Sequence, residues 1–143
     1  MSGEENKAVV RRVLDEAWNT GNLAVVDETF AADFVDHDAP PGLPGGLEGS
    51  RLLIGMYRTV FPDLHATVED QLSEGDRVVT RWSATGTHQG SLLGIPGTGR
   101  PVSFGGITIN RVVDGRIVEM WSGVDQMGML QQIGAIPAPA QAG

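Results

Sequence analysis

Acidic and histidine side chains in two parts of this sequence have the types and settings that proton transfer requires. Asp125 ends an apolar segment and begins a helical one, so its carboxylate either caps the helix or faces a pocket, where apolar walls would raise its pKa and make it a base. His37 stands between Asp36 and Asp38. A histidine flanked by carboxylates either passes protons near neutral pH or makes hydrogen bonds within a loop. We predict a pocket role for His37 ahead of either aspartate.

Another histidine and two arginines could polarise a substrate. His88 ends a predicted strand, where it either lines a pocket or satisfies backbone groups in a turn. Arg81 and Arg100 could hold a substrate carbonyl or carboxylate, although arginine on an alternating strand is usually a solvated or dimer-face residue. His37 and His88 with a carboxylate could ligate a metal, but no His-x-His or His-x-x-x-His spacing supports this. We therefore predict chemistry with no metal and no cofactor. The predicted catalytic residues are Asp125, His37, His88 and Arg81.

Aromatic residues recur along the predicted helices and strands, and we expect them to divide between the core and a pocket wall. The predicted substrate-binding residues are Trp18, Phe61, Trp82, Phe104, Thr108, Trp121 and Ser122. Alternation places Val78, Thr80, Trp82 and Ala84 on one face of a strand and their neighbours on the other. Because a single β-bulge reverses this parity, the sequence leaves open which face lines the pocket.

The elements that would position these residues follow from hydrophobic periodicity. Ser2 and Glu5 fit a capping box, and residues 9–18 carry an apolar stripe at helical spacing. Residues 23–30 predict a second short helix, and Ser50 is expected to cap a third helix that Pro62 ends. The stretch 39–46 is too rich in proline and glycine for regular structure, so we expect a loop at the pocket mouth.

The period then changes to that of strands. We predict strands over residues 64–72, 77–86, 101–112 and 116–125, with a hairpin turn at 113–115 and a short closing helix capped by Gly134. Helices followed by consecutive antiparallel hairpins indicate an α+β fold, in which a curved sheet encloses a pocket as a cone does. We expect one domain over residues 1–136 and a flexible tail over 137–143.

Composition excludes several classes of function. The formal net charge of -8 disfavours binding to nucleic acid or to an anionic membrane. The absence of cysteine excludes disulfides and thiolate sites. We see no secretory signal and no membrane-spanning run, so we expect a cytoplasmic protein. Apolar residues at both parities of the strands, such as Val78 with Val79, predict a homodimer.

The order of elements and several short strings resemble the SnoaL-like polyketide cyclases of the NTF2-like superfamily. The strings are WNTGN (18–22), FPDL (61–64), EGDRVV (74–79), GTHQG (86–90), GIP (94–96), RVVDGRIVE (111–119), DQ (125–126) and QIG (132–134). The resemblance spans residues 9–134. It implies intramolecular aldol ring closure of an aromatic polyketide ester without metal or cofactor, with an aspartate as general acid/base and a histidine nearby. That aspartate falls at Ser122 and that histidine near Thr108, so neither is retained here.

Two classes of function fit these residues. The first is a small enzyme that performs acid/base cyclisation or isomerisation of an apolar oxygenated molecule. The similar folds of ketosteroid isomerases and limonene epoxide hydrolases also make epoxide opening conceivable. The second is a non-catalytic protein that binds a hydrophobic small molecule, which the loss of the aspartate at Ser122 would favour. Ionisable side chains converging in the pocket would indicate the enzyme.

Overall fold

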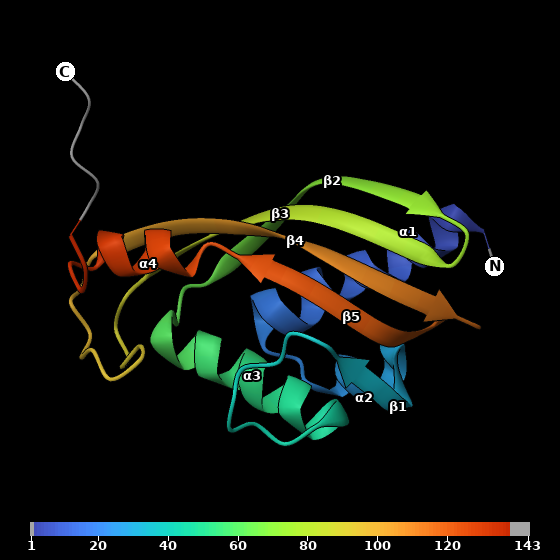
Figure 1. Cartoon of the computed structure of the whole chain (residues 1–143), viewed down its shortest axis with the longest axis horizontal. Coiled ribbons are helices and arrows are strands. Elements are labelled where there is room, and N and C mark those ends of the chain that lie inside the picture. The colour runs from blue at the N-terminus through green and yellow to red at the C-terminus, as the bar shows by residue number, and fades with distance from the viewer. Residues whose placement is uncertain (1, 138–143) are drawn as a thin grey trace.

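The computed structural model describes residues 2–137, in which helices pack on the concave face of a curved five-stranded sheet (Figure 1). The helices are α1 (Gly3–Arg12), the π-helix η1 (Val13–Trp18), α2 (Ala24–Thr29), α3 (Gly46–Val60) and α4 (Gln126–Gln132). The strands are β1 (Phe30–Asp36), β2 (His65–Glu74), β3 (Arg77–Thr87), β4 (Pro101–Val113) and β5 (Arg116–Val124). This arrangement confirms the predicted α+β class. Apart from residue 137, the predicted tail lies outside the described residues.

Four strands form the consecutive antiparallel hairpins that the sequence predicts. The sheet order is β1-β5-β4-β3-β2, and the observed ends of β2 to β5 differ from the predicted ones by at most two residues. The turn between β4 and β5 has φ values of 51° at Asp114 and 75° at Gly115, both in the left-handed region. Two consecutive positive φ values are those of a type I′ turn, which matches the twist of the flanking strands.

The fifth strand, β1, is not predicted as part of the sheet. It pairs in parallel with β5, which lies near the other end of the chain. A bulge interrupts the pairing between Phe30 and Val35. Parallel pairing at such a sequence separation leaves no local turn signal, which is why periodicity does not reveal it. The consequence is that the polar end of β1 lies beside the middle of β5.

The first helix forms as predicted, although its second half changes type. Ser2 and Glu5 make the reciprocal capping box. Residues 13–18 continue as a π-helix, in which each backbone hydrogen bond joins residues five apart, where an α-helix joins residues four apart. Val10, Val13 and Ala17 are buried and form a core cluster with residues of α2, β1 and the sheet.

The prediction that Ser50 caps the third helix is wrong. Helix α3 begins five residues earlier, after Gly45, and Ser50 lies inside it. The proline- and glycine-rich stretch ends sooner than composition indicates because residues 46–49 already have helical hydrogen bonding. Ser50 is therefore free to present its hydroxyl to the interior, where it is 8% exposed.

The structure resolves which face of each strand points inward. Val78, Thr80 and Ala84 of β3 are buried, whereas Arg81 between them is exposed. Thr80 pairs with Thr108 on β4, and Thr108 pairs with Ser122 on β5, so all three side chains lie on the same, inner face of the sheet. Polar side chains are thus built into the inner surface of the sheet.

Candidate functional site

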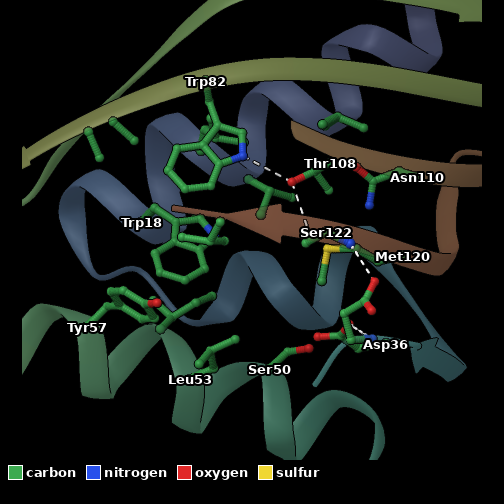
Figure 2. A pocket seen from close by; sticks show the side chains of 18 of the residues that line it. Trp18, Asp36, Ser50, Leu53, Tyr57, Trp82, Thr108, Asn110, Met120 and Ser122 are labelled. Atoms are coloured by element: carbon green, nitrogen blue, oxygen red, sulfur yellow. Dashed lines mark hydrogen bonds between the residues drawn. The ribbon is translucent and has the colours of Figure 1, made fainter. Parts of the chain in front are cut away.

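A cavity of about 450 Å³ lies between the concave face of the sheet and helices η1 and α3 (Figure 2). Its walls come from α1, η1, β1, α3, the four remaining strands and the first residue of α4. A volume of this size falls within the range of small-molecule sites. No lysine, arginine or histidine is among the described residues that line it.

One part of the cavity is aromatic. The Trp18 and Tyr57 rings meet edge to face with centroids 5.6 Å apart, and the Trp82 and Phe104 rings do so at 5.9 Å. The Tyr57 and Phe104 rings stack at 6.2 Å and connect the two pairs. Burial raises the pKa of the Tyr57 phenol, which keeps it neutral at physiological pH. These faces form a surface suited to a flat polycyclic ligand.

The WNTGN string positions Trp18 in that wall. The Asn19 side chain accepts the backbone N–H of Ala66 at 2.6 Å and donates to the Ala66 carbonyl at 2.9 Å, which ties the end of η1 to β2. Arg58 of α3 donates to the carbonyls of Trp18 and Asn19. Gly21 turns the chain away with a φ of +78°. The role of this string is therefore to fix the aromatic wall.

The opposite part of the cavity is polar. The Trp82 indole N–H donates to the Thr108 hydroxyl at 3.1 Å, and the Thr108 and Ser122 hydroxyls are 3.3 Å apart. The Asp38 carboxylate accepts the backbone N–H of Ser122 at 2.8 Å. Figure 2 shows Thr108 and Ser122 on the side of the cavity away from Tyr57, with Asp36 below them. A carboxylate thus lies against the Ser122 backbone although position 122 itself has none.

Asp36 has the environment of a general acid/base. Its carboxylate is partly buried at the end of β1, lines the cavity and accepts the backbone N–H of Asp38 at 3.0 Å. Burial, reinforced by the nearby charge of Asp38, raises the pKa of the Asp36 carboxyl, while that hydrogen bond and the His37 ring act in the opposite direction. A carboxylate with a raised pKa is a stronger base toward a carbon acid than an exposed one.

The structure places His37 on the outer side of β1, away from the cavity lining. Its Nε2 lies 2.8 Å from the Glu119 carboxylate, and its ring stacks on Trp121 with centroids 4.7 Å apart. Arg77 covers the Trp121 ring at 5.2 Å, and Arg111 donates to Glu119 at 2.6 Å. The hydrogen bonds from His37 and Arg111 lower the pKa of Glu119. Asp36 is the last residue of β1, and the chain turns at His37 and Asp38, so that both carboxylates line the cavity while the His37 ring stacks outside it on Trp121.

The other predicted catalytic residues also lie outside the cavity lining. Asp125 caps α4 by accepting the Gly128 N–H at 2.9 Å. His88 is fully buried beside Phe61, and its Nδ1 contacts Thr98 across the loop between β3 and β4. Arg81 pairs with Asp70 at 2.9 Å on the exposed face. Proton transfer by these residues and by His37 stays a prediction, and the geometry gives none of them direct contact with the cavity.

Five of the predicted substrate-binding residues line the cavity. They are Trp18, Trp82, Phe104, Thr108 and Ser122. Phe61 instead fills the core beneath the cavity at 0% exposure, and Trp121 faces outward against His37. The FPDL string is likewise structural, since the Asp63 carboxylate accepts the backbone N–H and hydroxyl of Thr87 at 2.7 Å.

Sequence reasoning missed Tyr57, Ser50 and Asn110 as cavity residues. Tyr57 lies on α3, and its ring forms part of the cavity wall. Asn110 carries a detectable signal, because it follows Thr108 at a spacing of two along an otherwise apolar strand face. Two polar residues in register on an inward face indicate a site.

Within residues 2–137, no three histidine, aspartate or glutamate side chains gather as a metal site would require. None of the described helices is both long and apolar enough to cross a bilayer.

Comparison with known proteins places this geometry among relatives. The family model described as SnoaL-like polyketide cyclase matches residues 8–133. The nogalonic acid methyl ester cyclase of Streptomyces nogalater is 31% identical over 82% of this chain and 90% of its own. The aklanonic acid methyl ester cyclase DnrD of Streptomyces peucetius is 29% identical over 88% of each chain.

Solved structures agree with the sequence comparison. TsrD from Streptomyces laurentii superposes with a TM-score of 0.87 at 29% identity, covering 95% of this chain and 99% of its own. IdmH from Streptomyces antibioticus superposes with a TM-score of 0.79 at 39% identity, covering 90% of this chain and 98% of its own.

Proposed function

The chain belongs to the SnoaL-like polyketide cyclase family, and from this we propose that it closes a carbon ring in an aromatic polyketide by an intramolecular aldol reaction. The curated relatives named above are cyclases of polyketide methyl esters. The observation that supports the proposal within this chain is Asp36, a partly buried carboxylate with a raised pKa that lines the cavity.

Asp36 would move one proton twice. Its carboxylate removes a proton from a carbon next to a substrate carbonyl and leaves an enolate. The enolate carbon attacks a second carbonyl carbon of the same molecule, which forms the new carbon–carbon bond. The oxygen of that second carbonyl becomes an alkoxide and takes the proton back from Asp36. No atom is gained or lost, so substrate and product have the same mass.

The cavity favours an uncharged substrate. Its described lining contains two carboxylates, Asp36 and Asp38, and no cationic side chain. A free carboxylate on the substrate would lose its hydration and meet like charge, which costs several kcal/mol in an apolar site. An ester avoids this cost, as in the methyl esters that the relatives' names describe. The aromatic wall formed by Trp18, Tyr57 and Phe104 would hold the rings already closed.

The binding-only alternative accounts less well for Asp36. A protein that only holds a hydrophobic ligand gains nothing from a desolvated carboxylate in its cavity, because burial of the charge costs free energy. We therefore favour catalysis over binding alone.

The direct test is incubation of the purified protein with nogalonic or aklanonic acid methyl ester. We expect a product of unchanged mass with a shifted chromatographic retention and absorption spectrum. The Asp36→Asn variant should form it at least about 100-fold more slowly. The matched control is Asp33→Asn, which removes the same charge from an exposed position on the same strand. Tight binding of either ester without any ring closure would instead support the binding protein.

We further propose that two copies pair through the outer face of the sheet. An apolar row crosses four strands there, from Leu72 through Val79 and Ile109 to Trp121, and Leu72 is 69% exposed. Covering such a row would remove apolar surface from water. Sedimentation at micromolar concentration should show about twice the chain mass of 15.2 kDa, and a species of 15.2 kDa alone would exclude the dimer.

We place the reaction in the cytoplasm, which suits a chain without cysteine.

A further inference from the structure

Asn110 is a buried amide with no partner in the part of the chain that the structure describes. The residue is 3% exposed and lines the cavity, and neither end of its side chain makes a hydrogen bond to a described residue. Both amide atoms also remain in contact with open space, unlike the Asn6 oxygen, which is sealed in the interior. Asn19 shows the ordinary arrangement, in which both ends of the amide bind backbone groups. The open space that Asn110 meets is therefore the cavity.

The other polar groups nearby are already engaged. Thr108 accepts from Trp82, its hydroxyl lies 3.3 Å from that of Ser122, and the Ser122 backbone N–H binds Asp38. Asn110 belongs to the same inward face as Thr108 and has none of these contacts (Figure 2). Because burying an amide without a hydrogen bond is unfavourable, an unpartnered one in a cavity indicates a ligand that completes it.

The sheet register places Asn110 opposite the proposed base. Asn110 on β4 pairs with Met120 on β5, and Met120 pairs with Asp36 on β1. The three residues form one row across the sheet, with Asn110 and Asp36 at its ends. Adjacent strands are about 4.8 Å apart, so the two backbones are separated by about 10 Å. The Met120 side chain lies between them on the same cavity-lining face, so a carbonyl group and the carbon next to it would rest over Met120 to reach both side chains.

We propose that the Asn110 amide donates a hydrogen bond to the substrate carbonyl oxygen whose neighbouring carbon loses its proton to Asp36. This role rests on the proposed cyclisation. When the proton moves to Asp36, one negative charge moves from the carboxylate to the enolate oxygen, and the described cavity lining offers no cation to receive it. A neutral donor held in place before the reaction stabilises that oxygen without reorganisation. Loss of one such donor typically reduces turnover by about 100- to 1,000-fold.

A naphtholate serves as a stable mimic of the enolate, since it places a negative oxygen on a flat aromatic frame. The test measures binding of 4-nitro-1-naphtholate and of the neutral 1-methoxy-4-nitronaphthalene by quenching of tryptophan fluorescence. The measurements use the Asp36→Asn background, which imitates the protonated base. We expect Asn110→Leu to weaken naphtholate binding by about 10- to 100-fold and to change methoxy-compound binding by less than about three-fold.

The matched control is Asn6→Leu, which changes a buried asparagine outside the cavity lining and should leave the binding of both compounds unchanged. Asn110→Ser, which leaves more space and a shorter donor, should lie between the wild type and Asn110→Leu for the naphtholate. Equal loss of both compounds, or loss of neither, would overturn the proposed donor. If the naphtholate selectivity depends on Asn110 while neither methyl ester cyclises, the donor role stands and the proposed reaction fails.

Discussion

Replacing Asp36 with asparagine should slow the reaction and stabilise the fold at the same time. The substitution keeps the shape of the side chain and leaves an oxygen to accept the Asp38 N–H, so the end of β1 should not move. It removes the proton acceptor, and a positioned base is worth about 10²–10⁴-fold in rate, or roughly 3–5 kcal/mol of activation free energy. It also removes a charge that burial disfavours.

The sign of the stability effect follows from the raised pKa. Between the ordinary aspartate pKa of about 3.9 and the higher value in the folded protein, the folded chain holds a proton that the unfolded chain has released. The free energy of unfolding therefore falls as the pH rises through this window, and the penalty persists above it. Asp36→Asn should raise the melting temperature at pH 7, and this gain should shrink as the pH falls through that window and be absent below about 4.

The assays are turnover of a polyketide methyl ester across pH and thermal melting of both proteins across the same range. The wild-type rate should fall on the acid side at a higher pH than for an unperturbed carboxylate. Asp33→Asn, exposed on the same strand, should change neither quantity appreciably. Turnover of Asp36→Asn within about three-fold of wild type would refute the assignment of the base. A lower melting temperature at pH 7 would refute the reasoning from burial.

Asn19→Ala should leave two backbone groups of Ala66 without partners, cost about 2–4 kcal/mol and lower the melting temperature by about 5–15 °C in a calorimetric scan. Asp125→Asn should melt like the wild type, whereas Asp125→Ala should cost about 1 kcal/mol through loss of the α4 cap. His37→Gln should change turnover by less than about three-fold because the ring lies on the outer face, and a loss above 100-fold would restore the role predicted from the sequence. Dialysis against a chelator should leave turnover unchanged, with elemental analysis as the check, since residues 2–137 form no metal-binding cluster.

Local chemistry allows most of the fold to be predicted from the sequence. The capping box at Ser2, the Asp114-Gly115 turn and the cap at Asp125 each depend on residues close together in the chain. The pairing of β1 with β5 depends on segments more than eighty residues apart, such as Phe30 and Ile117, and has no local signature. The predicted start of α3 is wrong because Gly45, which has no side-chain cap, precedes the helix.

The candidate site is harder to predict because the sequence does not show which of the neighbouring side chains, Asp36 or His37, faces the cavity. His37 has the more versatile side chain near neutral pH, which makes it the better candidate on chemistry alone. Its direction is set by the register of β1 against β5, where Asp36 pairs with Met120 and faces the cavity with it. The strings that carry the family resemblance fix structure, as Asn19 and Asp63 do, and therefore indicate the fold better than the catalytic groups.

The cavity also makes the response to hydrostatic pressure informative. The folded chain surrounds a cavity of about 450 Å³ that its own atoms leave unfilled, and the apolar parts of its wall hold water weakly. Unfolding eliminates such space, so pressure favours the unfolded chain, with typical volume decreases of about 20–100 mL/mol that scale with the void. A flat ligand that fills the cavity removes this empty space. It should therefore stabilise the folded protein against pressure by more than its binding free energy at ambient pressure alone would indicate.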